Sequence, residues 1–146
     1  MKAITLIVML MATALVVSAA NSQDKGGAKN QDESAKKIKE LQKERIATLE
    51  GMTDGATRLA KRGSHSIEEA CDAWLLLVRA QVDAAEADSD RIKFYETYVE
   101  AMQQFEELAK VRLEGAKGTK VTVLRAKANR LEAEIAIEQL KAKQGV

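Results

Sequence analysis

Apolar residues recur along most of this chain at steps of three and four, which is the spacing of one face of an α-helix. Four segments carry the pattern, at about 34–62, 66–85, 91–114 and 121–140. No segment alternates apolar and polar residues as a half-buried strand does. The pattern therefore predicts an all-α fold.

Two of the predicted helices have a clear apolar face. In the second, Ile67, Cys71, Trp74, Val78 and Val82 share one side. In the fourth, the shared side carries Val121, Leu124, Ala128, Leu131 and Ile135. We expect both sides to face the core. The second helix carries further leucines, so Trp74, Leu75 and Leu76 form a candidate apolar patch, which is a binding surface if exposed and core if covered.

Local sequence signals mark the predicted helix ends. Gly63 ends the first helix, and Ser66 with Glu69 fits a capping box at the start of the second. The glycines of the segment 115–118 end the third helix, and Thr119 caps the fourth. Between Ser66 and Glu114 the only candidate break is 88–90, which has no glycine or proline. A single helix through that segment is the alternative.

These ends divide the chain into two consecutive antiparallel helical hairpins, at about 34–88 and 91–143. The hairpins resemble each other: Gly63 and Ser66 match Ala116 and Thr119 at an offset of 53 residues, whereas residues 44–46 match 90–92 at an offset of 46. The seven-residue difference is close to two helical turns, so it lengthens a helix without rotating its apolar face. We interpret the chain as a doubled hairpin.

Residues 1–20 have the order of a secretory signal peptide: a lysine at position 2, an apolar run over 4–17, and small residues up to Ala20. We expect cleavage after Ala20 and export to the periplasm or secretion, with the mature chain peripheral to a membrane at most. The alternative is an uncleaved N-terminal membrane anchor. Residues 21–33 are polar and lack apolar periodicity, which predicts a disordered linker. The helical domain then spans 34–146.

Composition changes the picture in two ways. With no proline and 3% aromatic residues, the chain favours long helices and a thin, alanine-rich core. When residues 1–20 and their Lys2 are set aside, 22 basic residues face 22 acidic ones, which argues against a nucleic-acid partner.

Candidate chemistry is sparse. Cys71 is the single cysteine and lies at helical spacing between Ile67 and Trp74, so we expect a buried thiol, with an intermolecular disulfide as the alternative. His65 is the single histidine and lies between two serines, which favours a surface position. We find no pattern for a catalytic site, a metal or another cofactor, or a small-molecule substrate, and predict that the protein is not an enzyme.

The second hairpin resembles the helical hairpins of the TolC-type outer-membrane efflux family over residues 112–135. The matching positions are Arg112, Gly118, Thr119, Val123, Leu124 and the run 131–135, which reads Leu-Glu-Ala-Glu-Ile. Leu113 stands where the family has an aromatic residue and Thr122 where it has an aspartate. The strands of the family's membrane barrel are absent from the sequence.

The resemblance implies a fold of helical hairpins whose turns contact a partner protein. It makes Gly63, Ser66, Arg112, Gly118 and Thr119 candidate partner-binding residues. Our leading hypothesis is an exported structural or interaction protein of the cell envelope, which binds a protein partner or itself through its helices. The alternative hypothesis is a small periplasmic chaperone that holds unfolded clients on an apolar surface.

Overall fold

Four helices make up nearly all of the chain between residues 25 and 145, which are the residues that the structure, a computed structural model, describes. They are α1 (Lys25–Arg62), α2 (Ile67–Ala84), α3 (Asp88–Glu114) and α4 (Lys120–Gln144), and no strand occurs among the described residues. The predicted all-α class is confirmed. The predicted signal peptide, residues 1–20, lies outside the described residues.

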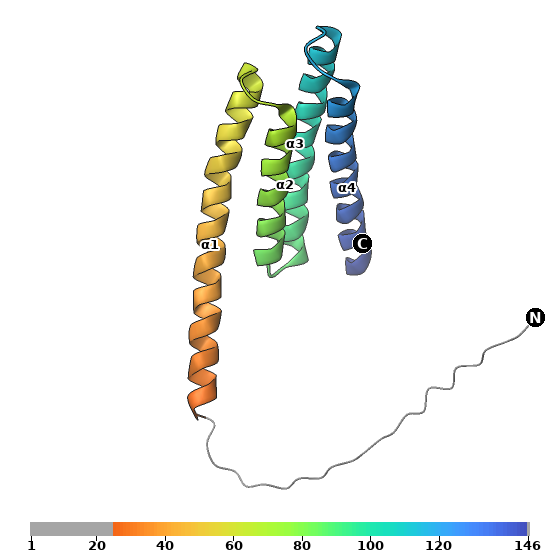
Figure 1. The fold of residues 1–146 in the computed structure, drawn as a ribbon. Helices are drawn as coiled ribbons and strands as arrows, with labels where there is room; N and C mark the ends of the chain where they lie inside the picture. Colours follow the sequence, from red (N-terminus) through yellow and green to blue (C-terminus); the bar gives the residue numbers. More distant parts are fainter. Residues whose placement is uncertain (1–24, 146) are drawn as a thin grey trace, which may run out of the picture.

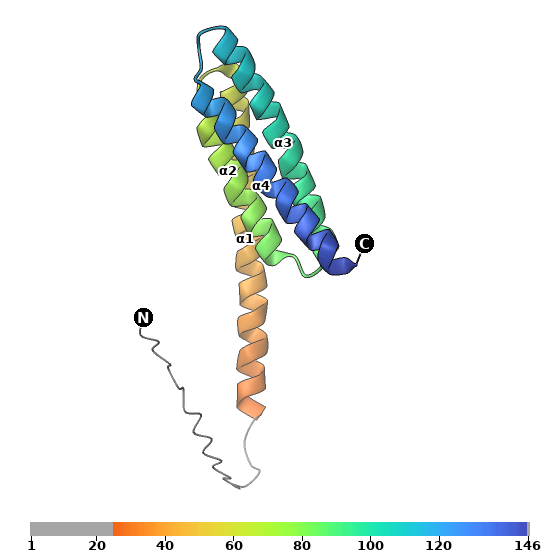
Figure 2. The same cartoon turned by 90° about the vertical axis from the view of Figure 1, so that its right-hand side faces the viewer.

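Consecutive helices run side by side in opposite directions (Figures 1 and 2). Thr53 donates to the carbonyl of Ala73 at 3.3 Å, and Lys39 pairs with Glu86 at 2.8 Å, so residue numbers fall along α2 as they rise along α1. The turns α1–α2 and α3–α4 lie at one end of the molecule, and the α2–α3 connection lies at the opposite end of α2 and α3, beyond which α1 projects (Figure 1). These contacts agree with the predicted hairpins.

The junction of the two hairpins is a three-residue connection rather than a continuous helix. α2 ends at Ala84 and α3 begins at Asp88, so the break lies just before the segment 88–90 and the single-helix alternative is wrong. Arg91 holds the connection, because its guanidinium pairs with Asp88 at 2.6 Å and donates to the carbonyl of Ala85 at 2.9 Å. The Arg91 side chain thus stabilises this connection, which contains no glycine or proline.

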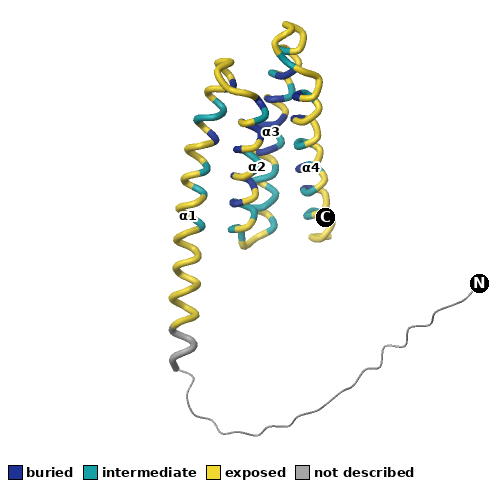
Figure 3. Tube along the Cα trace, in the orientation of Figure 1, coloured by how far each residue is buried: buried dark blue, intermediate teal, exposed yellow. Residues whose placement is uncertain are grey.

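α1 begins at Lys25, well inside the segment 21–33 that the sequence predicted to be a disordered linker. Residues 30–41 are all exposed, and this end of α1 projects beyond the other helices (Figure 3). The lack of apolar periodicity in this segment shows only that no other helix packs against it. A helix that is already nucleated can extend without a packing partner, because each added residue forms a further backbone hydrogen bond. That prediction is corrected from Lys25 onward.

The core is thin and rich in alanine, as predicted. Half of the sixteen buried apolar residues are alanines, which let the helices approach closely. Phe105, Met102, Ile67 and Val78 are the largest apolar side chains that are fully buried. All four come from α2 and α3, so the two central helices supply most of the apolar volume.

α4 packs through the face opposite to the one predicted. The predicted inward residues Val121, Leu124, Leu131 and Ile135 are 70%, 53%, 42% and 59% exposed, and Ala128 is exposed as well. The buried residues are instead Thr122, Ala126, Ala133 and Ile137. Small side chains on that face allow α4 to lie close to α3. Apolar periodicity located a real stripe but could not show what covers it.

A charged cluster links α3 to α4 beside this small-residue face. Glu106 accepts from Arg130 at 3.1 Å and pairs with Lys110 at 3.2 Å, and Arg130 also pairs with Glu134 at 2.7 Å. Burial alone would raise the pKa of Glu106, but the hydrogen bonds from Lys110 and Arg130 outweigh it and hold that pKa below its usual range. The cluster therefore stays ionised and fixes the register of the second hairpin.

Candidate partner-binding site at the paired turns

The α1–α2 turn reverses the chain through a left-handed glycine. Gly63 has a φ of 80°, its amide donates to Ala60 at 3.0 Å, and the next amide, of Ser64, donates to Leu59 at 3.0 Å. This pair of bonds is a Schellman motif, with the left-handed residue just past the helix end. Ser66 then caps α2, because its side chain accepts from the amide of Glu69 at 3.1 Å.

The capping box predicted at Ser66 forms only in half. The side chain of Glu69 does not return to the backbone of Ser66, and its carboxylate lies 3.5 Å from Nε2 of His65. His65 is exposed in the turn, as predicted. The serine therefore caps α2 alone, while the glutamate extends toward the solvent side of the turn.

The α3–α4 turn repeats this geometry. Ala116 has a φ of 56°, its amide donates to Leu113 at 3.0 Å, and the amide of Lys117 donates to Arg112 at 2.8 Å. Thr119 caps α4 by accepting from the amide of Thr122 at 3.2 Å. Both the left-handed residue and the capping residue recur at the predicted offset of 53. The structure thus confirms that the two turns are equivalent.

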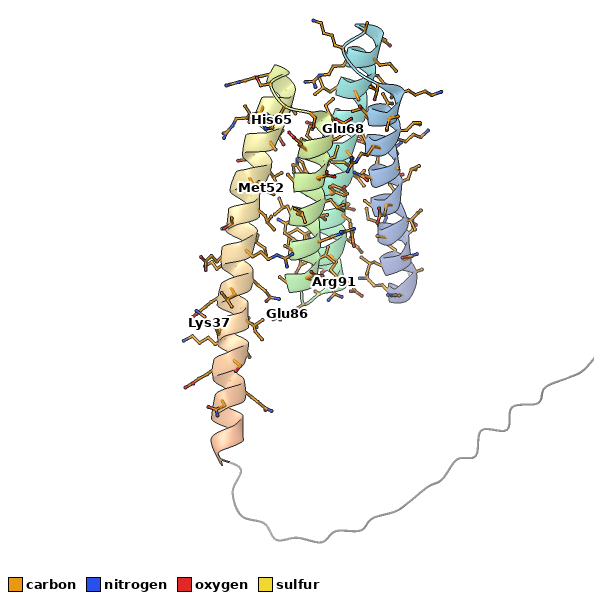
Figure 4. All side chains as sticks on the ribbon, viewed as in Figure 1. Lys37, Met52, His65, Glu68, Glu86 and Arg91 are labelled. Carbon is orange, nitrogen blue, oxygen red and sulfur yellow. The ribbon has the colours of Figure 1, made fainter. Side chains whose placement is uncertain are left out.

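The equivalent turns lie next to each other at one end of the molecule. The guanidinium of Arg112, in the second hairpin, donates to the carbonyl of Ala60, at the end of α1. Thr122 donates to the carboxylate of Glu68, which Figure 4 shows at the turn end of α2. One helical turn further on, Arg125 pairs with Asp72 at 2.6 Å. These contacts hold α2 and α4 parallel, with their capped ends together.

A small cleft of about 230 Å³ opens between the turns. Its lining includes four of the five predicted partner-binding residues, namely Ser66, Arg112, Gly118 and Thr119. The fifth, Gly63, lies at the edge, since a Cβ built on it would be 4.0 Å from the guanidinium of Arg112. The remaining lining residues are Ile67, Glu68, Ala109, Lys117 and Thr122.

Gly118 suits the close approach of the turn to the end of α3. A Cβ at this position would lie 3.1 Å from the Cβ of Arg112 and 3.2 Å from the amide nitrogen of Leu113. Backbone atoms of a capped helix end cannot move away as a flexible side chain can. Glycine therefore sets the shape of the cleft floor.

Sequence reasoning did not name five of the cleft residues as partner-binding residues, and two of these join the hairpins. Thr122 is 8% exposed and shares its hydroxyl with Thr119 at 3.0 Å, and Glu68 accepts from it across the two hairpins. In the sequence, Thr122 stood out only because it replaces the aspartate of the TolC-type family. The offset of 53 pairs Thr122 with Glu69, which places Thr122 in the first turn of its helix but gives no signal for its contact with Glu68 of α2.

The candidate patch of Trp74, Leu75 and Leu76 does not form one exposed surface. Trp74 is half-buried and donates to the hydroxyl of Thr57 at 3.1 Å, and both Trp74 and Leu75 pack against the core. Leu76 is 44% exposed. Two of the three residues thus belong to the packing of α1 and α3 against α2.

Reactive side chains lie away from the cleft. Cys71 is buried as predicted, and burial raises the pKa of its thiol to about 12. Burial also raises the pKa of Tyr98, whose hydroxyl has no hydrogen-bond partner in the described part of the chain. Among residues 25–145, no three His, Cys, Asp or Glu side chains gather in the way that holds a metal ion.

No family model matches the chain, and searches of curated proteins and of solved structures gave no match. The resemblance over residues 112–135 therefore stays a hypothesis that rests on those residues. Within residues 25–145, no helix combines the length and apolar character that a membrane crossing needs.

Proposed function

We propose that this chain is an exported, non-enzymatic interaction module of the cell envelope, which docks a protein partner through its paired turns. The observation that carries the proposal is the pairing of two equivalent turns around one cleft. A single turn offers a few polar groups, whereas two adjacent turns offer a shaped surface with hydroxyls, a guanidinium and a carboxylate. The resemblance to TolC-type hairpins, whose turns contact partner proteins, supports the same role.

The size of the cleft favours a protein side chain over a metabolite. Its volume of about 230 Å³ is below the range of roughly 300–1,000 Å³ that is usual for small-molecule pockets. Arg112, Lys117 and Glu68 all line the cleft, so the site offers both signs of charge. A polar side chain on a partner's helix or turn fits these features.

The test compares two glycines that differ in their surroundings. Gly118→Ala places a methyl group 3.1 Å from Arg112, whereas Gly55→Ala, in α1, meets nothing within 4 Å. Partner capture from envelope extracts, after cross-linking in cells, should fall severalfold for Gly118→Ala and stay unchanged for Gly55→Ala. Equal capture by both variants, each with the helicity of the parent, would contradict docking at the turns.

Lys117→Glu provides a second variant that does not crowd the turn. Lys117 is exposed and lines the cleft, so reversal of its charge alters the surface without adding volume to the core. Capture should fall with this variant too. An effect of Gly118→Ala without any effect of Lys117→Glu would assign the change to a distorted fold rather than to a lost contact.

The export part of the proposal rests on residues 1–20. Mass spectrometry of the protein recovered from its own cells should find a chain that begins at Asn21. A chain that retains Met1 and fractionates with membranes would instead support the alternative of an uncleaved anchor.

Exposed apolar residues favour a chaperone as the second candidate. Leu76 is 44% exposed, and Val121, Leu124 and Ile135 on α4 are more exposed still. The informative change is Leu76→Asp, since Trp74→Asp would also break the bond to Thr57. A chaperone should lose its suppression of client aggregation with Leu76→Asp while it keeps its helicity; unchanged suppression would exclude this surface.

A further inference from the structure

The outer face of α4 carries an apolar stripe that the described chain leaves uncovered. We define the α4 stripe as Val121, Leu124, Ala128, Leu131 and Ile135. Its members follow alternating steps of three and four, which is the spacing of a coiled-coil seam. Val121 is 70% exposed and Ile135 59% exposed, and small residues on the opposite face of α4 make the contacts to the bundle.

The position of α4 at one edge of the molecule leaves this stripe open. α4 contacts α3 closely and α2 more sparsely, while α1 lies at the opposite edge (Figures 1 and 2). Along the C-terminal half of the stripe a shallow groove of about 460 Å³ is lined mainly by apolar surface of Leu131, Ile135 and Ala142, with Glu134 and Glu138 at its rim. A second helix of similar pattern fits such a surface.

The charges beside the stripe change sign along its length. Arg125 and Lys127 flank the N-terminal half, and Glu132 and Glu134 flank the C-terminal half, at the positions where neighbouring coiled-coil helices exchange ion pairs. Arg125 also pairs with Asp72, and Glu134 with Arg130, within the chain. A surface with one basic and one acidic half is complementary to a second copy of itself turned end for end. An isologous contact of this kind is the usual basis of a two-fold dimer.

An antiparallel alignment of two α4 helices sets four of the five stripe residues opposite one another, and it sets Val121 opposite Glu138 of the second copy at the ends of the seam. With the two-fold axis between Asn129 and Arg130, Leu124 lies opposite Ile135 of the second copy, and Ala128 lies opposite its Leu131. The same alignment sets Arg125 beside Glu132 of the second copy and Lys127 beside its Glu134. Lys120 and Lys141, which carry like charges, meet only at the two ends of the contact.

A parallel alignment lacks this match. It keeps only the opposite-charge contact between Lys127 and Glu132 of the second copy, and it sets Lys120 beside Arg125 of the second copy, where like charges repel. It would also set Glu138, which follows Ile135 in the same three-four series, against Glu138 of the second copy within the seam. The charge pattern thus selects the antiparallel orientation.

We infer that α4 is a self-association face, through which two copies of this chain pair in antiparallel orientation. The inference uses none of the cleft residues proposed to dock a partner, so either can fail without the other. If both hold, the two-fold axis places the turn clefts of the two copies at opposite ends of the dimer. The dimer would then connect two partners rather than add to the binding of one.

The test measures the mass of the purified full chain over a range of concentrations by analytical ultracentrifugation. Leu131→Glu and its matched control Leu76→Glu alter residues that are 42% and 44% exposed, so they change the fold to a similar extent. The dimer should weaken at least about tenfold with Leu131→Glu and stay unchanged with Leu76→Glu, because only the first buries a charge in the seam. Met52→Glu, on the exposed side of α1, should also have no effect.

Three results would overturn the inference. They are a monomer at all concentrations, a dimer insensitive to Leu131→Glu, and a dimer lost with Met52→Glu, which would assign the contact to α1. Circular dichroism of each variant checks that helicity is retained.

Charge exchange tests the orientation. Lys127→Glu should weaken the dimer, and the addition of Glu134→Lys should restore it, because an antiparallel pair brings these two positions together. In a parallel pair, Lys127 lies beside Glu132 of the second copy instead. Restoration by Glu132→Lys, and not by Glu134→Lys, would therefore contradict the antiparallel arrangement.

Discussion

The equivalence of the two turns makes a prediction with opposite signs at two matched positions. Gly63 and Ala116 are both left-handed, with φ of 80° and 56°, and each follows the end of a helix in the same pair of hydrogen bonds. Glycine, at position 63, is suited to this backbone conformation, and alanine, at position 116, is not. Gly63→Ala should therefore destabilise the protein, whereas Ala116→Gly should stabilise it.

The magnitude follows from two terms. An L-residue in the left-handed helical region costs about 1–2 kcal/mol, which Ala116→Gly removes. Glycine gives the unfolded chain extra freedom, which offsets about 0.4–1 kcal/mol of that gain. The net change is about 0.5–1 kcal/mol for each variant, or about 1–4 °C in Tm for a chain of this size. Sterics add little, since the nearest atom to a Cβ at Gly63 is 4.0 Å away.

Urea unfolding followed by circular dichroism measures both variants. Ala47→Gly is the control, because Ala47 is exposed within α1, where glycine should cost about 0.5–1 kcal/mol. Ala116→Gly should raise the free energy of unfolding while the control lowers it. If Ala116→Gly destabilises the protein as much as the control does, Ala116 is not left-handed and the two turns are not equivalent.

Two further predictions concern the core. Phe105→Ala should lower the free energy of unfolding by about 3–5 kcal/mol, since Phe105 is 1% exposed. Val111→Ala, at a residue that is 58% exposed, should change it by no more than about 0.5 kcal/mol in the same urea assay. Similar losses for both variants would refute the packing described. Cys71 should react with iodoacetamide at pH 8 far more slowly in the native chain than in urea. A thiol with a pKa of about 12 is nearly all protonated at pH 8, and the thiolate is the reactive form. Rapid alkylation of the native chain would show an exposed thiol.

What the sequence predicted well was local. Gly63, Ser66 and Thr119 act on backbone groups within a few residues, so their roles can be inferred without knowledge of the fold. The repeat extended this success to the second turn. Its offset of 53 aligns Ala116 with Gly63, and Ala116, rather than one of the adjacent glycines, takes the left-handed conformation.

What the sequence could not predict depends on neighbours. In α4 four of the larger apolar residues lie on the solvent face, whereas the buried face carries Ala126 and Ala133 with Ile137, since small side chains allow close packing against α3. A rule that larger apolar residues point inward fails wherever close approach decides packing. The predicted start of the first helix was wrong for a related reason. A nucleated helix needs no packing partner to extend, so the polar residues from Lys25 onward did not end α1.

The central claim, that the paired turns form the docking end, is tested most directly by photo-cross-linking in cells from single positions. Lys117 is exposed at the paired turns, and Ser89 is exposed near the α2–α3 connection, at the opposite end of the molecule, where Figure 4 labels Glu86 and Arg91. A photoreactive residue at Lys117 should form an adduct with a different protein, and one at Ser89 should not. Adducts of equal yield from both positions, or none from Lys117, would contradict the claim.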